Sequence, residues 1–202
     1  MGPGVKGQQG MDIADLDGNS PKTGSNNKSD YSAMSSQLFP GEQQLRAAKI
    51  LIIDDEEADI RVLEWAFQMA KFPNVRSVTD SSQALEIFNR FQPDIVLLDL
   101  NMPEPDGFAV LKQLRQTAPV ADFLPVLVLT GQNTTEARSR AMAGGANDFL
   151  GKPVDYTEVM LRIKNLLLTR FLHQRAREMQ KQLEALPAGG ETHPPNKPVP
   201  KR

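Results

Sequence analysis

Cysteine is absent from this chain of 202 residues, so disulfide bonds and thiolate chemistry are excluded. Acidic and basic side chains nearly cancel, with a formal net charge of -2, and no overall basic field favours nucleic acid. No apolar run approaches the roughly 20 residues that span a bilayer, and the N-terminus lacks the apolar segment of a secretory signal. We therefore expect a cytoplasmic protein without a membrane or direct nucleic-acid partner.

Composition separates the ends of the chain from its centre. Residues 1–46 are rich in Gly, Ser, Asn and Gln and have few large apolar side chains, so we predict that they are disordered. Residues 187–202 are rich in proline, which predicts a loose tail. Between these ends we expect a domain over residues 47–167 and an extended helix over residues 168–186.

Short aliphatic runs alternate with helical patterns in the centre of the chain. Strands are expected at residues 48–53, 75–79, 95–98, 124–129 and 146–150. A helical pattern follows each of them, with Ser81 and Ser82 as caps of the second helix and Thr134 and Thr135 as caps of the fourth. Aliphatic runs without polar alternation indicate strands covered on both faces. The alternation therefore predicts an α/β fold, a doubly wound parallel sheet of five strands.

The side chains that follow the predicted strands carry the chemistry. Asp54 and Asp55 follow the first strand and Asp99 the third. Thr130 follows the fourth strand and Lys152 the fifth. Functional groups of such sheets gather outside the carboxyl ends of the strands. Three carboxylates, a hydroxyl and an ammonium group should therefore meet at one edge of the sheet.

This combination of groups suits phosphoryl chemistry. Neighbouring carboxylates raise one another's pKa unless a cation neutralises them. Mg²⁺ suits oxygen ligands and is usually held by one or two carboxylates plus phosphate oxygens. A carboxylate can attack phosphorus to form an aspartyl phosphate, and cationic donors neutralise the phosphoryl oxygens. The pattern predicts a Mg²⁺-dependent reaction of an aspartate with a phosphoryl group.

Together these segments resemble the receiver domain of bacterial response regulators, the CheY-like phosphoacceptors of two-component signalling. The resemblance runs from about Lys49 to Asn165 and rests on KILIIDDEE, PDIVLLDLNMPEPDGF, PVLVLTG and GANDFLGKP. It implies a flavodoxin-like (βα)5 fold and a signalling phosphoacceptor rather than a conventional enzyme. The chain has no GxxxxGK(S/T) loop of P-loop nucleotidases. Asn101 stands where haloacid-dehalogenase phosphatases carry a second aspartate, which argues against that class.

The resemblance also implies the metal ligands and the phosphorylated residue. Asp99 would accept the phosphoryl group and contact Mg²⁺. Asp55 would bind Mg²⁺ directly, and Asp54 would assist, partly through water. Asn101 would offer its backbone carbonyl to the metal.

The remaining implied roles concern the phosphoryl group and the switch. Thr130 would bind a phosphoryl oxygen and reorient on activation. Lys152 would pair with the phosphoryl group, and its bond to Pro153 would be cis. Phe149 stands where the family often has a switch tyrosine, so its ring can change rotamer but cannot make the phenolic hydrogen bond.

Several of these side chains also have a simpler interpretation. Glu56 and Glu57 are expected to be solvated acids at a helix start, where acids are favourable. Phe149 also suits a core position. We interpret Trp65 as a packing residue and His173 as solvated on a polar helix.

The last helical pattern continues past residue 167, where a receiver would end. Residues seven apart along it form a seam of Leu172, Met179 and Leu186 together with Leu168, Arg175 and Gln182. Two of these six residues, Arg175 and Gln182, are polar, so the sequence leaves open a homodimeric coiled coil and a solvated helix without a partner.

The resemblance implies partners but does not name them. A sensor histidine kinase or a phosphotransfer protein would supply the phosphoryl group, and a downstream effector protein would respond. The stretch NLLLTRFLHQRAREMQKQLE is also similar to connectors that join receivers to cyclic-di-nucleotide enzymes. The alternative is therefore a regulatory receiver fragment of a cyclic-di-nucleotide phosphodiesterase or cyclase that lacks its output domain. A receiver that only scaffolds is disfavoured by the complete set of acids, threonine and lysine.

Overall fold

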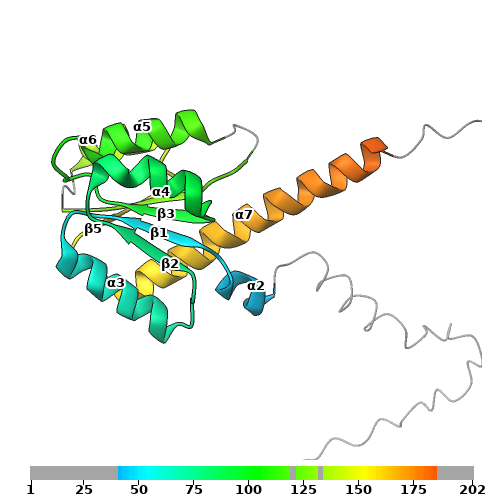
Figure 1. Ribbon diagram of the computed structural model, residues 1–202, viewed down its shortest axis with the longest axis horizontal. Helices are drawn as coiled ribbons and strands as arrows, with labels where there is room; N and C mark the ends of the chain where they lie inside the picture. The colour runs from blue at the N-terminus through cyan, green and yellow to red at the C-terminus, as the bar shows by residue number, and fades with distance from the viewer. Residues whose placement is uncertain (1–40, 119–121, 132–133, 186–202) are drawn as a thin grey trace, which may run out of the picture.

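The computed structural model describes residues 41–118, 122–131 and 134–185. Within these ranges a sheet and its helices form one body, and the last helix projects from it (Figure 1). The predicted disorder of residues 1–40 and the predicted tail at 187–202 lie outside the described residues. A short helix, α2 (Glu42–Arg46), occupies part of the stretch for which we predicted disorder, so that prediction is wrong there.

Five parallel strands form the sheet in the order β2-β1-β3-β4-β5. They are β1 (Ile50–Ile53), β2 (Val75–Val78), β3 (Ile95–Leu98), β4 (Val126–Thr130) and β5 (Asp148–Gly151). Every residue of β1, β3 and β4 is buried, because helices cover both faces of the sheet. The predicted doubly wound parallel fold is confirmed.

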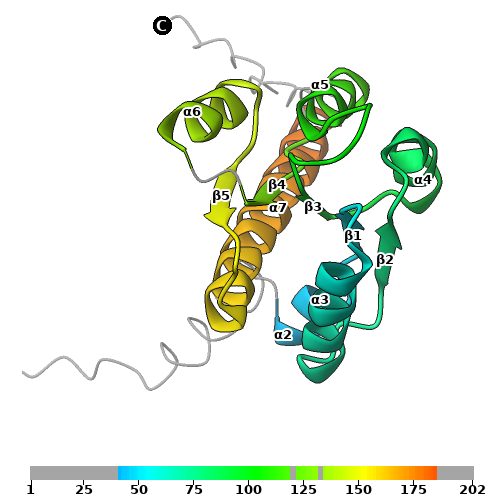
Figure 2. The same cartoon turned by 90° about the vertical axis from the view of Figure 1, so that its left-hand side faces the viewer.

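Helices divide between the two faces of the sheet, as Figure 2 shows. On one face lie α3 (Glu57–Met69) and α7 (Tyr156–Ala185), and on the other lie α4 (Ala84–Phe91), α5 (Gly107–Thr117) and α6 (Thr135–Ala143). A separate hydrophobic core lies on each face of the sheet, and alternate side chains of β3 point into one or the other. Ile95 and Leu97 pack under α3 and α7, whereas Val96 and Leu98 pack under α4, α5 and α6.

The turn before α4 differs from the prediction. Asp80, rather than Ser81 or Ser82, is the cap residue, and its carboxylate accepts hydrogen bonds from the amide and hydroxyl of Ser82 at 2.9 and 2.6 Å. Ser81–Gln83 forms the short 3-10 helix η1 ahead of α4. An ionised carboxylate is a stronger acceptor than a hydroxyl, so Asp80 takes the cap and the serine becomes a donor. The fourth helix, α6, is capped by Thr134 as predicted.

The α7 helix is anchored to the body where it leaves the sheet. Arg170 donates to the Asp94 carboxylate at 3.1 Å and to the Phe123 carbonyl at 2.7 Å. His173 is exposed, yet its ring stacks on Phe123 with 4.9 Å between the ring centroids, so it is not simply solvated as expected. These contacts fix the direction in which the helix leaves the body.

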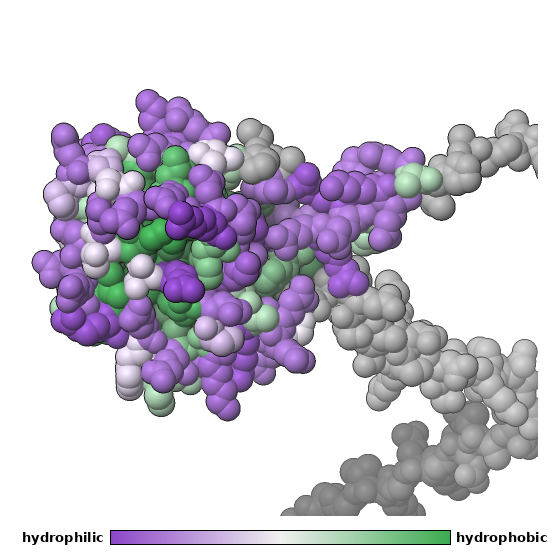
Figure 3. Space-filling view, viewed as in Figure 1, coloured by the Kyte–Doolittle hydropathy of each residue, from purple (hydrophilic) through white to green (hydrophobic). Residues whose placement is uncertain are grey.

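The surface of the body is mixed. Figure 3 shows apolar side chains gathered between α4 and α3, whereas the face of α7 seen there is mostly hydrophilic. Within the described ranges, no helix combines the length and the apolar character that crossing a bilayer requires.

Candidate acidic site at the carboxyl edge of the sheet

Strand register brings two of the predicted acids together. β1 and β3 are neighbours in the sheet, and Ile53 pairs with Leu98, so Asp54 and Asp99 leave adjacent strands at the same level. The amide of Asp99 donates to the Ile53 carbonyl at 2.9 Å. Figure 2 looks onto this edge, where the loops after the strands meet.

An acidic cluster results from this register. Asp54, Asp55 and Asp99 each place one carboxylate oxygen within 4.8 Å of the others. Asp54 and Asp99 are buried and Asp55 is partly exposed, so the cluster is open to water on one side. Mg²⁺ prefers hard oxygen ligands and keeps several waters. The donor set therefore fits such an ion, with one carboxylate able to act through water.

Lys152 reaches the cluster from the loop after β5. Its ammonium nitrogen lies 2.7 Å from Asp54 Oδ2 and 2.8 Å from Asp99 Oδ2. The β4–β5 ladder sets this position, because Thr130 pairs with Gly151 and the Lys152 amide donates to the Thr130 carbonyl at 2.8 Å. Side chains that follow β1, β3 and β5 thus meet at one edge of the sheet.

A fourth carboxylate, Asp59, was not predicted. It lies in the first turn of α3, and its Oδ2 is 2.7 Å from Lys152 Nζ. The sequence did contain a signal for it. Asp59 is an acid in the first turn of the helix that follows Asp54 and Asp55, so a helix starting at this edge carries it towards the site.

Burial and charge act in opposite directions at this cluster. Removal from water raises the pKa of the Asp54 carboxyl, although hydrogen bonds from Lys152 and from the Glu56 amide oppose the rise. Burial alone would lower the pKa of Lys152, but its hydrogen bonds to three carboxylates raise that pKa above its ordinary value. The ammonium group therefore stays charged and partly neutralises its acidic neighbours.

The loop after β3 packs tightly against the start of α5. Asp99 Oδ1 accepts a hydrogen bond from the Asn101 amide at 3.0 Å, while the Asn101 side chain is exposed. A Cβ atom at Gly107 would lie 2.1 Å from the Asp99 carbonyl oxygen, so any other residue would displace the backbone that carries Asp99. The metal-binding role of the Asn101 carbonyl stays a prediction.

Thr130 and Phe149 lie on the last two strands, and both are buried. Phe149 packs in the core beneath α5 and α6, and the Arg138 guanidinium carbon lies 5.8 Å from its ring centroid. This burial agrees with the core interpretation, while the switch role of both residues stays a prediction. The Lys152–Pro153 peptide bond is cis, the geometry that the resemblance implied.

Three apolar side chains of α3 face solvent, and the first of them, Val62, lies beside the site. Val62, Trp65 and Met69 are 60%, 60% and 63% exposed, and their spacing places them on one face of the helix. We call them the α3 patch. The interpretation of Trp65 as a packing residue is wrong, because other residues of α3 fill the side towards the sheet. A groove lined by Val62 joins the patch to Lys152.

Comparison with known proteins places the chain in a family. The response regulator receiver domain family matches residues 50–164. Response regulator PleD of Caulobacter vibrioides is 38% identical over 125 residues, which cover 62% of this chain and 27% of PleD. RpaA of Synechocystis, a DNA-binding dual master transcriptional regulator, is 35% identical over 119 residues, which cover 59% of this chain and 48% of RpaA. The chain therefore spans only about a quarter to a half of these relatives.

Solved structures agree with the sequence relatives. A response regulator from Chloroflexus aurantiacus J-10-fl aligns at 32% identity with a TM-score of 0.55, over 59% of this chain and 97% of that one. The receiver domain of Francisella response regulator 1452 aligns at 27% identity with a TM-score of 0.54, over 59% and 96%. Since the family match covers more than half of the sequence, this chain belongs to the response regulator receiver domain family of two-component signalling.

Proposed function

We propose that this receiver accepts a phosphoryl group on Asp99 in a Mg²⁺-dependent reaction and thereby switches its protein contacts. One observation carries the proposal: the Lys152 ammonium group lies 2.8 Å from Asp99 Oδ2, beside two further clustered carboxylates. A nucleophilic carboxylate, a fixed cation and an acidic pair suited to a divalent ion together meet the needs of phosphoryl transfer.

The reaction is a displacement at phosphorus. A carboxylate oxygen of Asp99 forms a bond to phosphorus while the bond to the leaving group of the donor breaks, and the leaving group departs with the bonding electrons. Lys152 turns from the Asp99 oxygen to a phosphoryl oxygen, and the Thr130 hydroxyl binds another. Asp54, Asp55 and Asp99 would hold Mg²⁺, which would supply positive charge to neutralise the phosphoryl oxygens. Asp59 keeps the Lys152 side chain directed into the site.

The switch would pass from the edge of the sheet into the core. Thr130 and Phe149 lie on the paired strands β4 and β5. A shift of Thr130 towards a phosphoryl oxygen alters the space beside Phe149, whose ring packs beneath α5 and α6. We therefore propose that a downstream effector protein binds the surface formed by α6 and β5 and responds to this change.

A protein phosphodonor has to approach the open side of the acidic cluster. The α3 patch of Val62, Trp65 and Met69 is exposed, and it begins at Val62, which lines the groove beside Lys152. Exposed aromatic residues are frequent anchors of protein interfaces. We propose that a sensor histidine kinase or a phosphotransfer protein docks there, whereas a small phosphodonor does not need the patch.

Labelling with a small phosphodonor tests the proposal. With acetyl phosphate and Mg²⁺ the wild-type chain should gain one base-labile phosphoryl group, and with EDTA it should gain little. Asp99→Ala should gain none, while Glu56→Gln, which changes an exposed acid beside the cluster, should label like the wild type. Equal labelling of Asp99→Ala and wild type would show that the site is wrongly assigned.

The output of the switch has two candidates. One is a receiver that acts through protein contacts alone, and the other is regulation of a cyclic-di-nucleotide enzyme, which stays a prediction from the connector-like sequence. A reading frame that continues past Arg202 into such a catalytic domain would decide for the second.

A further inference from the structure

A narrow apolar stripe runs along the outer side of α7. It consists of Leu161, Leu168, Leu172, Met179 and Leu183, which we call the α7 stripe. Leu161, Met179 and Leu183 are 58%, 56% and 70% exposed, and Leu168 and Leu172 are partly exposed. The described part of the chain thus leaves these five apolar side chains accessible on one helix.

The stripe lies opposite the side of α7 that the sheet buries. At about 100° per residue, its five members fall within about 60° of one another around the helix axis. The buried side is made by Val159, Met160, Ile163 and Leu167, and its centre lies about 150° away. The stripe is therefore no extension of the core, and its contacts have to come from outside the described body.

The stripe repeats every eleven residues. Leu161, Leu172 and Leu183 are eleven apart, and so are Leu168 and Met179. An eleven-residue repeat keeps apolar side chains in line along a nearly straight helix and favours a slight right-handed supercoil. It is an alternative to the seven-residue seam predicted from the sequence.

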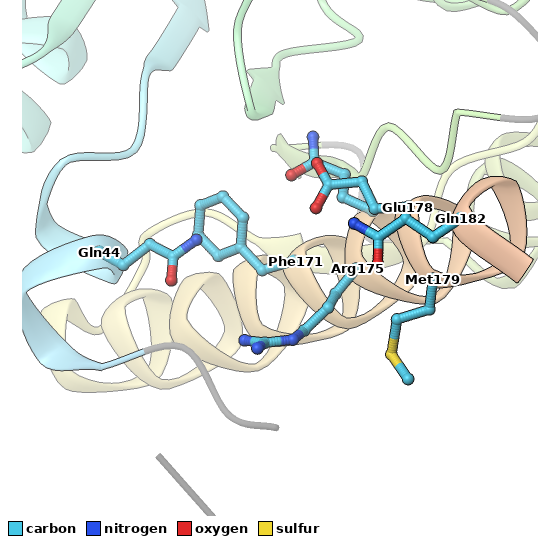
Figure 4. A pocket seen from close by; sticks show the side chains of 7 residues that line it. Gln44, Phe171, Arg175, Glu178, Met179 and Gln182 are labelled. Atoms are coloured by element: carbon cyan, nitrogen blue, oxygen red, sulfur yellow. The ribbon is translucent and has the colours of Figure 1, made fainter. Parts of the chain in front are cut away.

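The seven-residue seam fails at its polar members. Arg175 and Gln182 turn away from the stripe, by about 50° and 70° from its centre. Both line a groove between α2 and α7 that also includes Gln44 and Phe171. In Figure 4 the Met179 side chain points away from Glu178 and from Gln44. Met179 lies at the border and lines the groove as well, whereas the other four residues of the stripe do not line it.

We propose that the α7 stripe is a dimer interface on which a second copy of this chain packs in parallel and in register. When two copies of the helix lie parallel and in register, each apolar side chain of the stripe lies opposite the same residue of the other copy. The stripe is therefore complementary to a second copy of itself. From Leu161 to Leu183 the stripe extends about 33 Å at 1.5 Å per residue, a contact long enough for a helix pair. It is narrow, so the dimer should depend on concentration.

The charges beside the stripe favour the parallel arrangement. One flank carries Lys164 and Arg175, and the opposite flank carries Thr169, Ala176 and Gln180 together with Arg162, whose charge is neutralised by ion pairs with Asp148 and Glu158. In a parallel pair each cationic flank faces the neutral flank of its partner. In an antiparallel pair the two cationic flanks would face each other, and like charges at such positions repel. The proposal is independent of the chemistry at Asp99.

Analytical ultracentrifugation over a range of concentrations tests the interface. The full chain should show a monomer–dimer equilibrium. Met179→Glu should raise the dissociation constant at least about tenfold, because it buries an unpaired charge, whereas the adjacent control Gln180→Glu should change it little. Far-UV circular dichroism checks that each variant is folded. A chain that stays monomeric, or equal effects of the two variants, would overturn the proposal.

Disulfide crosslinking tests the register of the two helices. Because the chain has no cysteine of its own, each variant would carry a single thiol. Leu183→Cys lies on the stripe, and Gln182→Cys lies on the seven-residue seam one position away. Under mild oxidation Leu183→Cys should form a covalent dimer several times faster than Gln182→Cys. Equal rates, a faster Gln182→Cys, or slow crosslinking of both would overturn the parallel eleven-residue packing.

Discussion

Replacing Lys152 by methionine tests how the acidic cluster is held together. Lys152 Nζ lies within 2.8 Å of three carboxylate oxygens, from Asp54, Asp59 and Asp99. Removing one partner of a buried ion pair costs about 3–5 kcal/mol, because the remaining charges are left uncompensated. Lys152 is 18% exposed and Asp59 is 45% exposed, so water screens part of the loss. We expect the free energy of unfolding to fall by about 2–3 kcal/mol in EDTA.

Mg²⁺ should reduce the difference in free energy of unfolding between the wild type and Lys152→Met. At about 100 times its dissociation constant, a ligand that binds only the folded state stabilises it by about 2.7 kcal/mol. In Lys152→Met the metal takes over the neutralisation of Asp54 and Asp99, so it should stabilise the variant more than the wild type.

Urea unfolding followed by far-UV circular dichroism measures both effects. Lys112→Met, which changes an exposed lysine of α5, is the control and should alter stability by less than about 0.5 kcal/mol. A loss for Lys152→Met as small as that of the control, or a loss that Mg²⁺ leaves unchanged, would refute the electrostatic reasoning.

Three further predictions concern the backbone, the protons and the docking surface. Gly107→Ala should lower the free energy of unfolding in urea by more than about 2 kcal/mol, since its Cβ would overlap the Asp99 carbonyl. The control Gly41→Ala, whose Cβ would meet nothing within 4 Å, should lower it little. Similar losses of stability for both variants would contradict the tight packing at Gly107. Burial raises the pKa of Asp54 in the folded state. The contribution of this carboxyl group to the free energy of unfolding is therefore fully present below the unfolded-state pKa and is lost as pH rises through the folded-state pKa. In EDTA the wild type should therefore lose stability relative to Asp54→Asn as pH increases from about 4, and a constant difference between the two proteins would oppose this. Trp65→Ser should slow phosphotransfer from a cognate histidine kinase but not from acetyl phosphate, and an equal effect on both donors would exclude the docking role.

The fold could be predicted because its signals are local. Aliphatic runs such as Ile95–Leu98 and Val126–Thr130 are buried on both faces, and this is visible as an absence of polar alternation. The convergence of Asp54 and Asp99 followed from the same reasoning, since parallel strands end at one edge.

The misses concern contacts between elements. Asp59 joins the site because α3 begins close to the loop that carries Lys152. Its place in the first turn of a helix at this edge was a local signal, but its contact with Lys152 depends on how two separate elements pack. Trp65 was interpreted as a packing residue, whereas other residues of α3 already fill the side of the helix that faces the sheet. Asp80 caps the turn before α4 in place of Ser81 or Ser82, because a charged carboxylate accepts a hydrogen bond more strongly than a serine hydroxyl does.

The last helix has the predicted length, and the exposure of its side chains suggests a different spacing for its apolar contact. Its extension beyond residue 167 is present up to Ala185, the limit of the described residues at that end. The seven-residue spacing that included Arg175 and Gln182 fits the exposure of the helix less well than the eleven-residue spacing. Exposure separates the two, because it shows which side of the helix the sheet leaves uncovered.

Locating the phosphoryl group on the chain tests the central claim most directly. Borohydride reduces an aspartyl phosphate to homoserine, so peptide mapping after acetyl phosphate and Mg²⁺ treatment identifies the modified residue. We predict homoserine at position 99 in the wild type and markedly less of it in Lys152→Met and Asp55→Asn. Homoserine at position 54 or 55 instead, or equal yield in all three proteins, would contradict the account.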